Sequence, residues 1–246
     1  MKREELFITT KVWSNSHTEE LALASVRRSL ANLRLEYLDL VLVHWPQSFR
    51  SGGDYIPRVN GNISGTILAP VDPTKENFTL AYKGLEQAVA LNLTRSIGVS
   101  NFNRGQLEKL LQTPNLAIKP AVNQVELHPL LSQKDLLEYA TSVGVRLEAY
   151  SPLRRGDAKM LENPSLKAIA AKYGKSVAQV VLRWQLQRGV IVIPKTSRRA
   201  RMVENADLFS PGFLLTAEEV ATVETLNADD RLIKFEDSAH LAEYPF

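Results

Sequence analysis

Residues 38–46 of this chain read LDLVLVHWP. The run Leu38–Val43 is almost continuously apolar and rich in branched side chains, and a histidine follows it directly. Short apolar runs of this kind are typical of strands that are buried on both faces, as strands of a parallel sheet are. The segment therefore predicts a buried parallel strand with a polar group, His44, at its carboxyl end.

Five further runs have the same character, and each is followed by a segment with helical periodicity. The six predicted strands are Leu6–Thr10, Leu38–Val43, Ser96–Val99, Ala121–Val125, Val145–Ala149 and Val190–Ile193. Two helix starts are also predicted, by the capping-box pairs Ser16 with Glu19 and Ser176 with Gln179. Buried strands that alternate with helices indicate a parallel sheet covered by helices.

Such a sheet is either open and doubly wound or closed into a barrel. An open sheet that binds a dinucleotide is expected to carry a G-x-G-x-x-G turn, and none of the twelve glycines falls in that pattern. The sequence therefore favours a parallel α/β barrel of the TIM type, of which six of the eight strand-helix units are recognisable.

Composition limits the other classes of protein. The 246 residues, of which 44% are hydrophobic, predict a single domain over residues 1–246. A net charge of +3 with interspersed charges predicts neither a nucleic-acid nor a membrane partner. The absence of cysteine excludes disulfides and thiolate catalysis. The charged start, Met1–Glu5, has no apolar run behind it, so a cytoplasmic protein is expected.

Polar residues follow the predicted strands at the carboxyl end, where barrels carry their chemistry. These strand ends read Lys11-Val12-Trp13, His44-Trp45-Pro46, Ser100-Asn101-Phe102, Gln124 to His128, Tyr150-Ser151-Pro152 and Lys195-Thr196-Ser197. The stretch Gln47–Pro73 interrupts the pattern. We interpret it either as a loop that shapes a substrate pocket or as a mobile surface loop.

In this order, the motifs make the chain resemble the aldo-keto reductase family, whose members are eight-stranded barrels that reduce carbonyls with NADPH. Among the matching motifs are Thr10-Lys11-Val12-Trp13, Val43-His44-Trp45-Pro46, Gly98-Val99-Ser100-Asn101-Phe102, Asn123-Gln124-Val125-Glu126-Leu127-His128-Pro129, Tyr150-Ser151-Pro152-Leu153 and Ile193-Pro194-Lys195. The resemblance implies reduction of a small-molecule aldehyde or ketone with NADP(H) as cofactor.

Four residues match catalytic and substrate-pocket positions of the family. Lys11 matches the lysine that lowers the pKa of the proton donor, and His44 matches the histidine that orients the carbonyl. Trp13 and Trp45 match aromatic walls of the substrate pocket. Each has a structural alternative: Lys11 as a solvated strand end, His44 as a hydrogen-bonded core residue, and the tryptophans as core filling.

The resemblance also implies a cofactor site. Ser100, Asn101 and Gln124 match the groups that bind the nicotinamide carboxamide, and Tyr150 matches the aromatic that stacks on its ring. Ser151 and Leu153 match positions along the pyrophosphate. Positions at the adenosine 2′-phosphate and the adenine are matched by Lys195, Thr196, Ser197, Arg201, Glu204 and Asn205.

Physical arguments favour a phosphate near the last of these segments. A helix that begins at Ser197 offers free N–H groups, and Lys195 with Arg201 adds charge-assisted hydrogen bonds. The alternatives are an ordinary basic helix face and a nucleic-acid patch. The run Arg154-Arg155-Gly156 departs from the family's usual pattern and predicts that an arginine replaces backbone donors at the pyrophosphate.

The resemblance begins at the third strand of the family's barrel, so the chain is expected to be truncated at its N-terminal side. The first two units carry the family's catalytic aspartate and proton-donating tyrosine, and neither Tyr37 nor Tyr55 is an evident substitute. We therefore expect weak or absent carbonyl reduction, and self-association through open sheet edges. The alternatives are a non-catalytic NADPH-binding or regulatory module and a truncated product without stable function.

Overall fold

The computed structural model describes residues 1–51 and 71–246. The chain divides into two compact units. The first comprises Met1–Asn123, Val143–Val145 and Lys234–Phe246, and the second comprises Gln124–Ser142 and Arg146–Ile233. The single domain over residues 1–246 stays a prediction. Most of the predicted loop Gln47–Pro73, including Tyr55, lies outside the described residues.

The six strands follow one another in the sheet in their order along the chain. They are β1 (Thr9–Val12), β2 (Leu38–Val43), β3 (Thr94–Ser100), β4 (Val122–Glu126), β5 (Arg146–Tyr150) and β6 (Ile191–Val192). The pairings β1–β2, β2–β3 and β5–β6 are parallel. Strands β1 and β6 end this order and do not pair with each other among the described residues. The predicted parallel α/β fold with six strand-helix units and incomplete closure is confirmed.

The first predicted strand, Leu6–Thr10, was wrong in its bounds. Leu6 and Phe7 are exposed and precede β1. The carboxylate of Asp39 accepts a hydrogen bond from the Ile8 N–H at 2.8 Å, so this N–H is satisfied by a side chain. Regular pairing with β2 begins one residue later, at Thr9 opposite Leu40.

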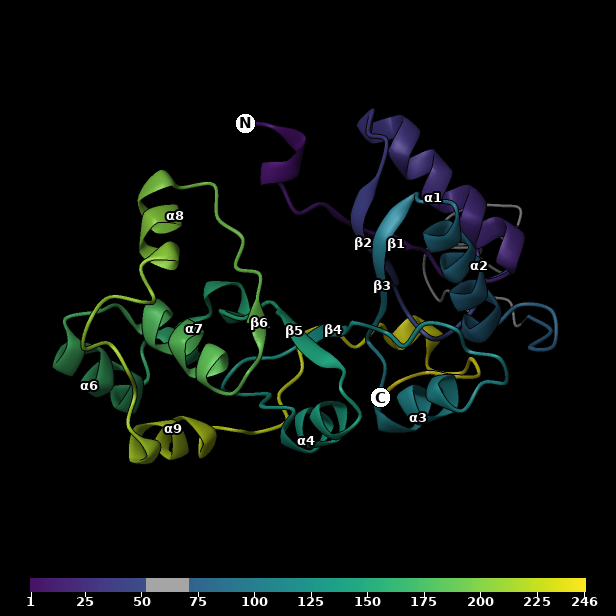
Figure 1. The fold of residues 1–246 in the computed structure, drawn as a ribbon. Helices are drawn as coiled ribbons and strands as arrows, with labels where there is room; N and C mark the ends of the chain where they lie inside the picture. Colours follow the sequence, from purple (N-terminus) through teal and green to yellow (C-terminus); the bar gives the residue numbers. More distant parts are fainter. Residues whose placement is uncertain (52–70) are drawn as a thin grey trace. The chain divides into compact units, whose positions relative to one another are not determined.

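In the first unit, helices α1 (Glu19–Leu33) and α2 (Phe78–Ala90) lie side by side and contact β1, β2 and β3 (Figure 1). A Cβ atom on Gly84 of α2 would stand 2.4 Å from the Glu19 carbonyl oxygen, so glycine permits this close approach. The predicted capping box of Ser16 with Glu19 was wrong. Because α1 begins at Glu19, its N-cap is Thr18, whose hydroxyl accepts from the Leu21 N–H at 3.2 Å.

The first unit also contains helix α3 (Arg104–Leu111). The buried side chains of Leu40, Leu42 and Val122 form a core cluster of this unit. Gly98 of β3 lies against this cluster, since an added Cβ atom would meet the Val122 carbonyl oxygen at 2.6 Å. A glycine is therefore required sterically at this point of the sheet.

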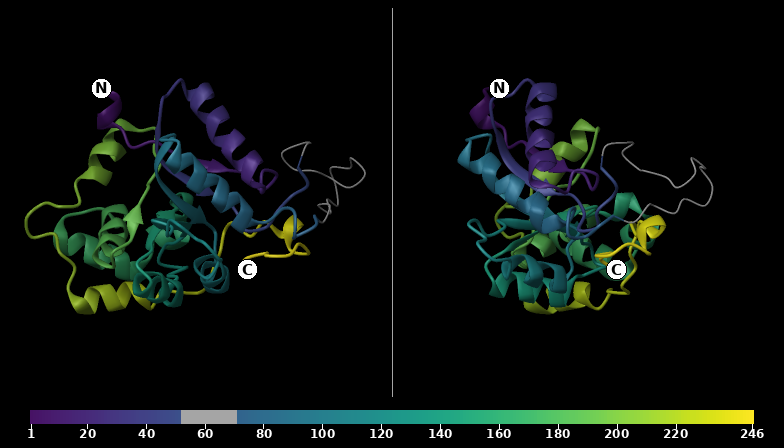
Figure 2. Two further views of the ribbon diagram at one scale, coloured as in Figure 1. Left: turned by 45° about the vertical axis from the view of Figure 1, so that its right-hand side comes forward. Right: turned by 90° about the vertical axis from the view of Figure 1, so that its right-hand side faces the viewer.

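The second unit is mainly helical. Its helices are α4 (Lys134–Ser142), α5 (Ala158–Leu161), α6 (Pro164–Tyr173), α7 (Val177–Gln187), α8 (Arg199–Ala206) and α9 (Ala217–Glu224). Helix α6 contacts α7 and α9, and Figure 2 shows this group from two further sides. The predicted capping box of Ser176 with Gln179 at the start of α7 is confirmed. No helix in the described ranges is long and apolar enough to cross a membrane.

Candidate active site and cofactor cavity

His44 directly follows β2 and lies between two tryptophan rings. Its ring centroid is 4.9 Å from Trp13, edge to face, and 6.4 Å from Trp45, with the planes nearly parallel. Lys11 stands in β1 opposite Leu42. Burial, and secondarily the charge of Lys11, lower the pKa of His44 to about 4. The imidazole is therefore neutral at pH 7, with one ring nitrogen as a hydrogen-bond donor and the other as an acceptor.

The aromatic group around His44 is larger than the sequence indicated. Phe235 packs on both tryptophans, at 6.1 Å from Trp13 and 5.4 Å from Trp45. Phe49 and Phe246 add edge-to-face contacts to Trp13 and Trp45 respectively. Sequence reasoning missed these phenylalanines because they follow no strand and carry no periodic signal. Whether Trp13 and Trp45 wall a substrate pocket stays a prediction.

The side chain of Asn101, which follows β3, contacts the backbone of His44. The Asn101 Nδ2 donates to the His44 carbonyl oxygen at 2.9 Å and to the Ser100 hydroxyl at 3.2 Å. Asn101 is left-handed, with φ of +62°, a conformation that asparagine tolerates better than most residues. Asn123 holds the next residue, Phe102, by hydrogen bonds to its backbone carbonyl and N–H. Three predicted site residues, His44, Ser100 and Asn101, are thus held together in the first unit.

Gln124 of β4 and Tyr150 of β5 both belong to the second unit, and the two strands are neighbours in the sheet. The Gln124 Nε2 donates to the Glu148 carboxylate at 2.5 Å, and both side chains are buried. Burial is the main cause that raises the pKa of Tyr150, whose hydroxyl lies against the backbone of Glu126. The phenol therefore stays protonated at neutral pH.

The motif that contains Gln124 holds a second buried acid, Glu126, which accepts from the backbone N–H groups of Leu232 and Ile233 at 2.8 and 2.9 Å. His128 adds a contact at 2.9 Å. Burial acts to raise the pKa of Glu126, but these hydrogen bonds hold it below the ordinary value. Glu126 and Glu148 were not recognised from the sequence, where an acid inside a strand looks like an ordinary exposed charge.

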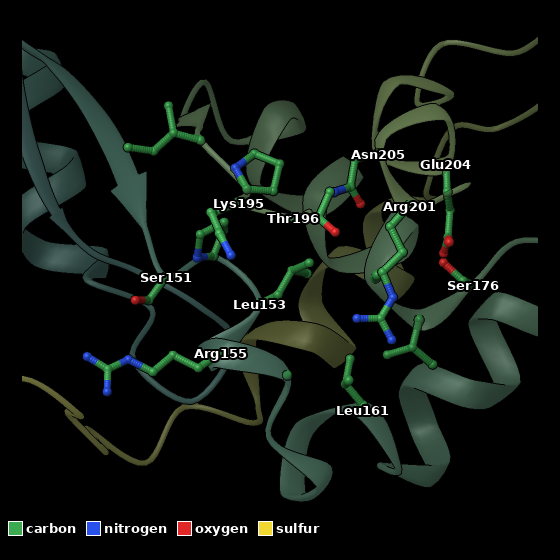
Figure 3. Close-up of a pocket in the computed structure, with 16 residues that line it drawn as sticks. Ser151, Leu153, Arg155, Leu161, Ser176, Lys195, Thr196, Arg201, Glu204 and Asn205 are labelled. Atoms are coloured by element: carbon green, nitrogen blue, oxygen red, sulfur yellow. The ribbon is translucent and has the colours of Figure 1, made fainter. Parts of the chain in front are cut away.

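A cavity of about 730 Å³ lies within the second unit (Figure 3). Ser151 and Arg155 stand on one side of it, and Arg201, Glu204 and Asn205 on the other. Of the predicted cofactor residues, seven line the cavity: Ser151, Leu153, Lys195, Thr196, Arg201, Glu204 and Asn205. Ser197 is exposed and is absent from the lining.

Helix α8 lines the cavity with one side, through Arg201, Glu204 and Asn205. The prediction that it begins at Ser197 was wrong, since residues before Arg199 are not helical and the Arg198 N–H is taken by the Thr196 hydroxyl at 3.1 Å. Its N-cap residue, Arg198, makes no side-chain cap hydrogen bond in the part of the chain that is described. Uncapped first-turn N–H groups next to cationic side chains favour an anion.

The two consecutive arginines after β5 have different surroundings. Arg154 is buried and its guanidinium forms ion pairs with Asp157 at 3.1 Å and Asp230 at 3.0 Å. Arg155 is exposed, has a φ of +56° and lines the cavity. Of the two arginines, Arg155 lines the cavity and Arg154 does not, and the replacement of backbone donors at the pyrophosphate stays a prediction.

These residues fit a large anionic ligand. The volume lies in the range of small-molecule and cofactor sites, and three cations, Arg155, Lys195 and Arg201, surround it. A parallel α/β fold with such a cavity at the strand ends is the framework of a dinucleotide-binding protein of the barrel class. The chain belongs to the aldo-keto reductase family, whose model matches residues 1–228.

Individual relatives agree with this assignment. The chain is 42% identical over 230 residues to glyoxal reductase of Bacillus subtilis, covering 94% of this chain and 71% of that protein. It is 39% identical over 256 residues to human aldo-keto reductase family 1 member C1, covering all of this chain and 76% of that protein.

Solved structures of relatives resemble the whole chain. The aldose reductase of Schistosoma japonicum superposes with a TM-score of 0.89 at 36% identity, covering 100% of this chain and 77% of the other. An aldo-keto reductase of Bombyx mori in complex with NADP gives a TM-score of 0.85 at 35% identity, covering 100% of this chain and 76% of the other.

Proposed function

We propose that this protein is an NADPH-dependent oxidoreductase that reduces small aldehydes or ketones to alcohols. The observation that carries the proposal is the cation-lined cavity of the second unit, which collects seven residues that match cofactor positions of the family. Family membership supports it, as does the NADP bound in a similar structure.

The proposed cofactor contacts fall into three groups. The 2′-phosphate is bound by Lys195, Thr196, Ser197 and Arg201, and the adenine lies near Glu204 and Asn205. Ser151, Leu153 and Arg155 lie along the pyrophosphate. The nicotinamide is bound by Ser100, Asn101, Gln124 and Tyr150. When bound, the dinucleotide supplies the hydride.

His44 and Lys11 act on the substrate carbonyl in this proposal. With a pKa of about 4, His44 is neutral and donates a hydrogen bond to the carbonyl oxygen. The positive charge of Lys11 stabilises negative charge that develops on that oxygen. The same low pKa makes His44 a poor proton source at pH 7, because almost none of it is protonated.

The catalytic residues matched in this chain do not include the family's proton donor. The family's tyrosine and aspartate match no position in residues 1–246. Tyr37 lies before β2, at the opposite end of the strand from His44, and its ring is covered by the guanidinium groups of Arg3 and Arg95 at 4.0 and 4.1 Å. The catalytic part of the proposal therefore rests on Lys11 and His44. A non-catalytic NADPH-binding or regulatory module is the second candidate, favoured by a cavity that is formed within one unit.

The two candidates are separated by one pair of measurements. NADPH oxidation is followed with a reactive aldehyde, and NADPH binding is followed by calorimetry. The enzyme proposal expects turnover that falls at least tenfold in Lys11→Ala and His44→Ala, in the range typical of acid–base and electrostatic groups. Binding without turnover above a protein-free control supports the binding module. Absence of binding overturns both.

A further inference from the structure

Gln124 and Glu148 form a buried pair across β4 and β5. The side chains are 3% and 6% exposed, and the Gln124 Nε2 lies 2.5 Å from a Glu148 carboxylate oxygen. Nothing in the proposed catalytic or cofactor contacts uses Glu148. A buried carboxylate is expensive to maintain in a strand, so its role in this pair needs an explanation.

The chemistry of the pair is directional. An ionised carboxylate only accepts hydrogen bonds, whereas a glutamine amide has a donor end, Nε2, and an acceptor end, Oε1. With Glu148 in place, the Gln124 amide must turn its Nε2 toward the acid. Its Oε1 then points away from Glu148. The reversed amide would bring two oxygen acceptors together in a buried place, which is strongly unfavourable.

The strand that carries Glu148 also carries Tyr150. Side chains two residues apart on a strand project from the same face, so Glu148 and the proposed nicotinamide-stacking ring share one face of β5. Gln124, the proposed carboxamide contact, stands on the adjacent strand. Glu148 therefore lies beside Gln124 and Tyr150, the residues proposed to contact the nicotinamide end of the cofactor.

We propose that Glu148 is a positioning residue that fixes the Gln124 amide so that its carbonyl oxygen accepts from the carboxamide NH₂ of the nicotinamide. The inference rests on the proposed function and deepens it. Glu148 makes the site selective for a dinucleotide with a primary carboxamide. Analogues that lack this NH₂ leave the oxygen of Gln124 without its hydrogen bond and bind less well.

The test compares NADP⁺ with its 3-acetylpyridine analogue, in which a methyl group replaces the NH₂. Calorimetric titration of the unmodified protein is expected to show a preference of about tenfold for NADP⁺, the size of one unmade hydrogen bond. In Glu148→Gln, residue 148 offers either a donor or an acceptor, so the Gln124 amide is no longer held in one orientation. The preference is expected to fall to about threefold or less.

A second background shows whether Glu148 acts through Gln124. In Gln124→Leu the preference is already lost, and adding Glu148→Gln is expected to change it no further, because the two sites are coupled. Asp39→Asn is the matched control: Asp39 is also a buried strand carboxylate, paired with Arg3 and Arg95, and its loss is expected to lower stability without changing the preference.

The outcomes separate the two proposals. A protein that binds neither dinucleotide overturns the proposed function and this inference with it. Binding of NADP⁺ with an unchanged preference in Glu148→Gln overturns the inference alone. If Glu148→Gln does not fold, NMR of the unmodified protein decides, since slow exchange of the Gln124 Nε2 protons supports the fixed amide and fast exchange contradicts it.

Discussion

The side chain of Asn101 donates a hydrogen bond to the backbone carbonyl of His44 at 2.9 Å. This contact joins the ends of β2 and β3, so a predicted cofactor residue holds the backbone of a predicted catalytic one. The left-handed φ of Asn101, +62°, directs its side chain back toward the neighbouring strand end. Two predicted site residues therefore depend on one local conformation.

Replacing Asn101 by alanine is expected to lower the free energy of unfolding by about 2–3 kcal/mol. The change removes the bonds to His44 and Ser100 and puts a less tolerant residue at a positive φ. Urea denaturation measures the loss. Asn115→Ala is the control, because Asn115 has a φ of +61° on the exposed surface. Equal losses in the two variants would show that the His44 contact contributes nothing.

Acid is expected to destabilise the protein through His17. This histidine is fully buried, its Nδ1 lies 2.8 Å from the Ser48 hydroxyl, and burial lowers its pKa from 6.5 to about 3. Between pH 7 and 4.5 the unfolded chain takes up a proton at this residue and the folded chain does not, so the free energy of unfolding falls as the pH falls. The contribution of His17 over this interval is about 2–3 kcal/mol.

The variant His17→Gln isolates this contribution. Its free energy of unfolding is expected to fall less between pH 7 and 4.5 than that of the unmodified protein, by the same amount. His44 contributes in the same direction in both proteins, since its pKa is also lowered. Parallel pH profiles from denaturant titrations would contradict the prediction.

Arg201→Ala is expected to weaken NADPH binding by about 10–100-fold while changing NADH binding little. A charge-assisted hydrogen bond to the 2′-phosphate is lost, and NADH has no such phosphate. Calorimetric dissociation constants for both dinucleotides give the comparison. Arg199→Ala on the same helix is the control, because Arg199 is exposed and does not line the cavity. An equal loss for NADPH and NADH would place the 2′-phosphate elsewhere.

Substitutions of Arg154 and Arg155 are expected to have different effects, one on the stability of the protein and the other on cofactor binding. Arg154→Met leaves Asp157 and Asp230 without their buried partner and is expected to cost about 1–3 kcal/mol, since both acids keep some access to water. Arg155→Met is expected to leave the melting temperature nearly unchanged and to weaken NADPH and NADH alike. Thermal unfolding and titration of both variants check this assignment, and reversed effects would refute it.

Gly98→Ala is expected to destabilise the first unit by about 1–3 kcal/mol, because the added methyl group meets the Val122 carbonyl oxygen at 2.6 Å and the Leu42 side chain at 2.9 Å. Gly105→Ala in α3 is the matched control. Its new Cβ atom meets only the Asn103 Oδ1 at 3.6 Å, and alanine favours the helix. Denaturant unfolding of both variants is the measurement. A neutral Gly98→Ala would mean that the strands move apart without cost.

Local sequence signals predicted the elements well where one physical cause dominates. The bounds of β2 were predicted correctly because an unbroken apolar run has no alternative to burial. The capping box of α7 was also correct, since a Ser176–Gln179 pair satisfies two backbone groups by itself. The predicted start of α1 was wrong. Ser16 and Thr18 both carry a hydroxyl that can serve as an N-cap, and Thr18 is the residue that caps the helix.

By itself, the sequence determined that six parallel strands alternate with helices, because buried apolar runs and helical periodicity are local patterns, whereas the candidate ligand-binding residues were named from the family resemblance. Only the tertiary structure decided which arginine of Arg154-Arg155 reaches the cavity, how Phe235 packs against the tryptophans, and that Glu148 faces Gln124. These facts depend on contacts between residues far apart in the chain, and neither spacing nor composition records such contacts.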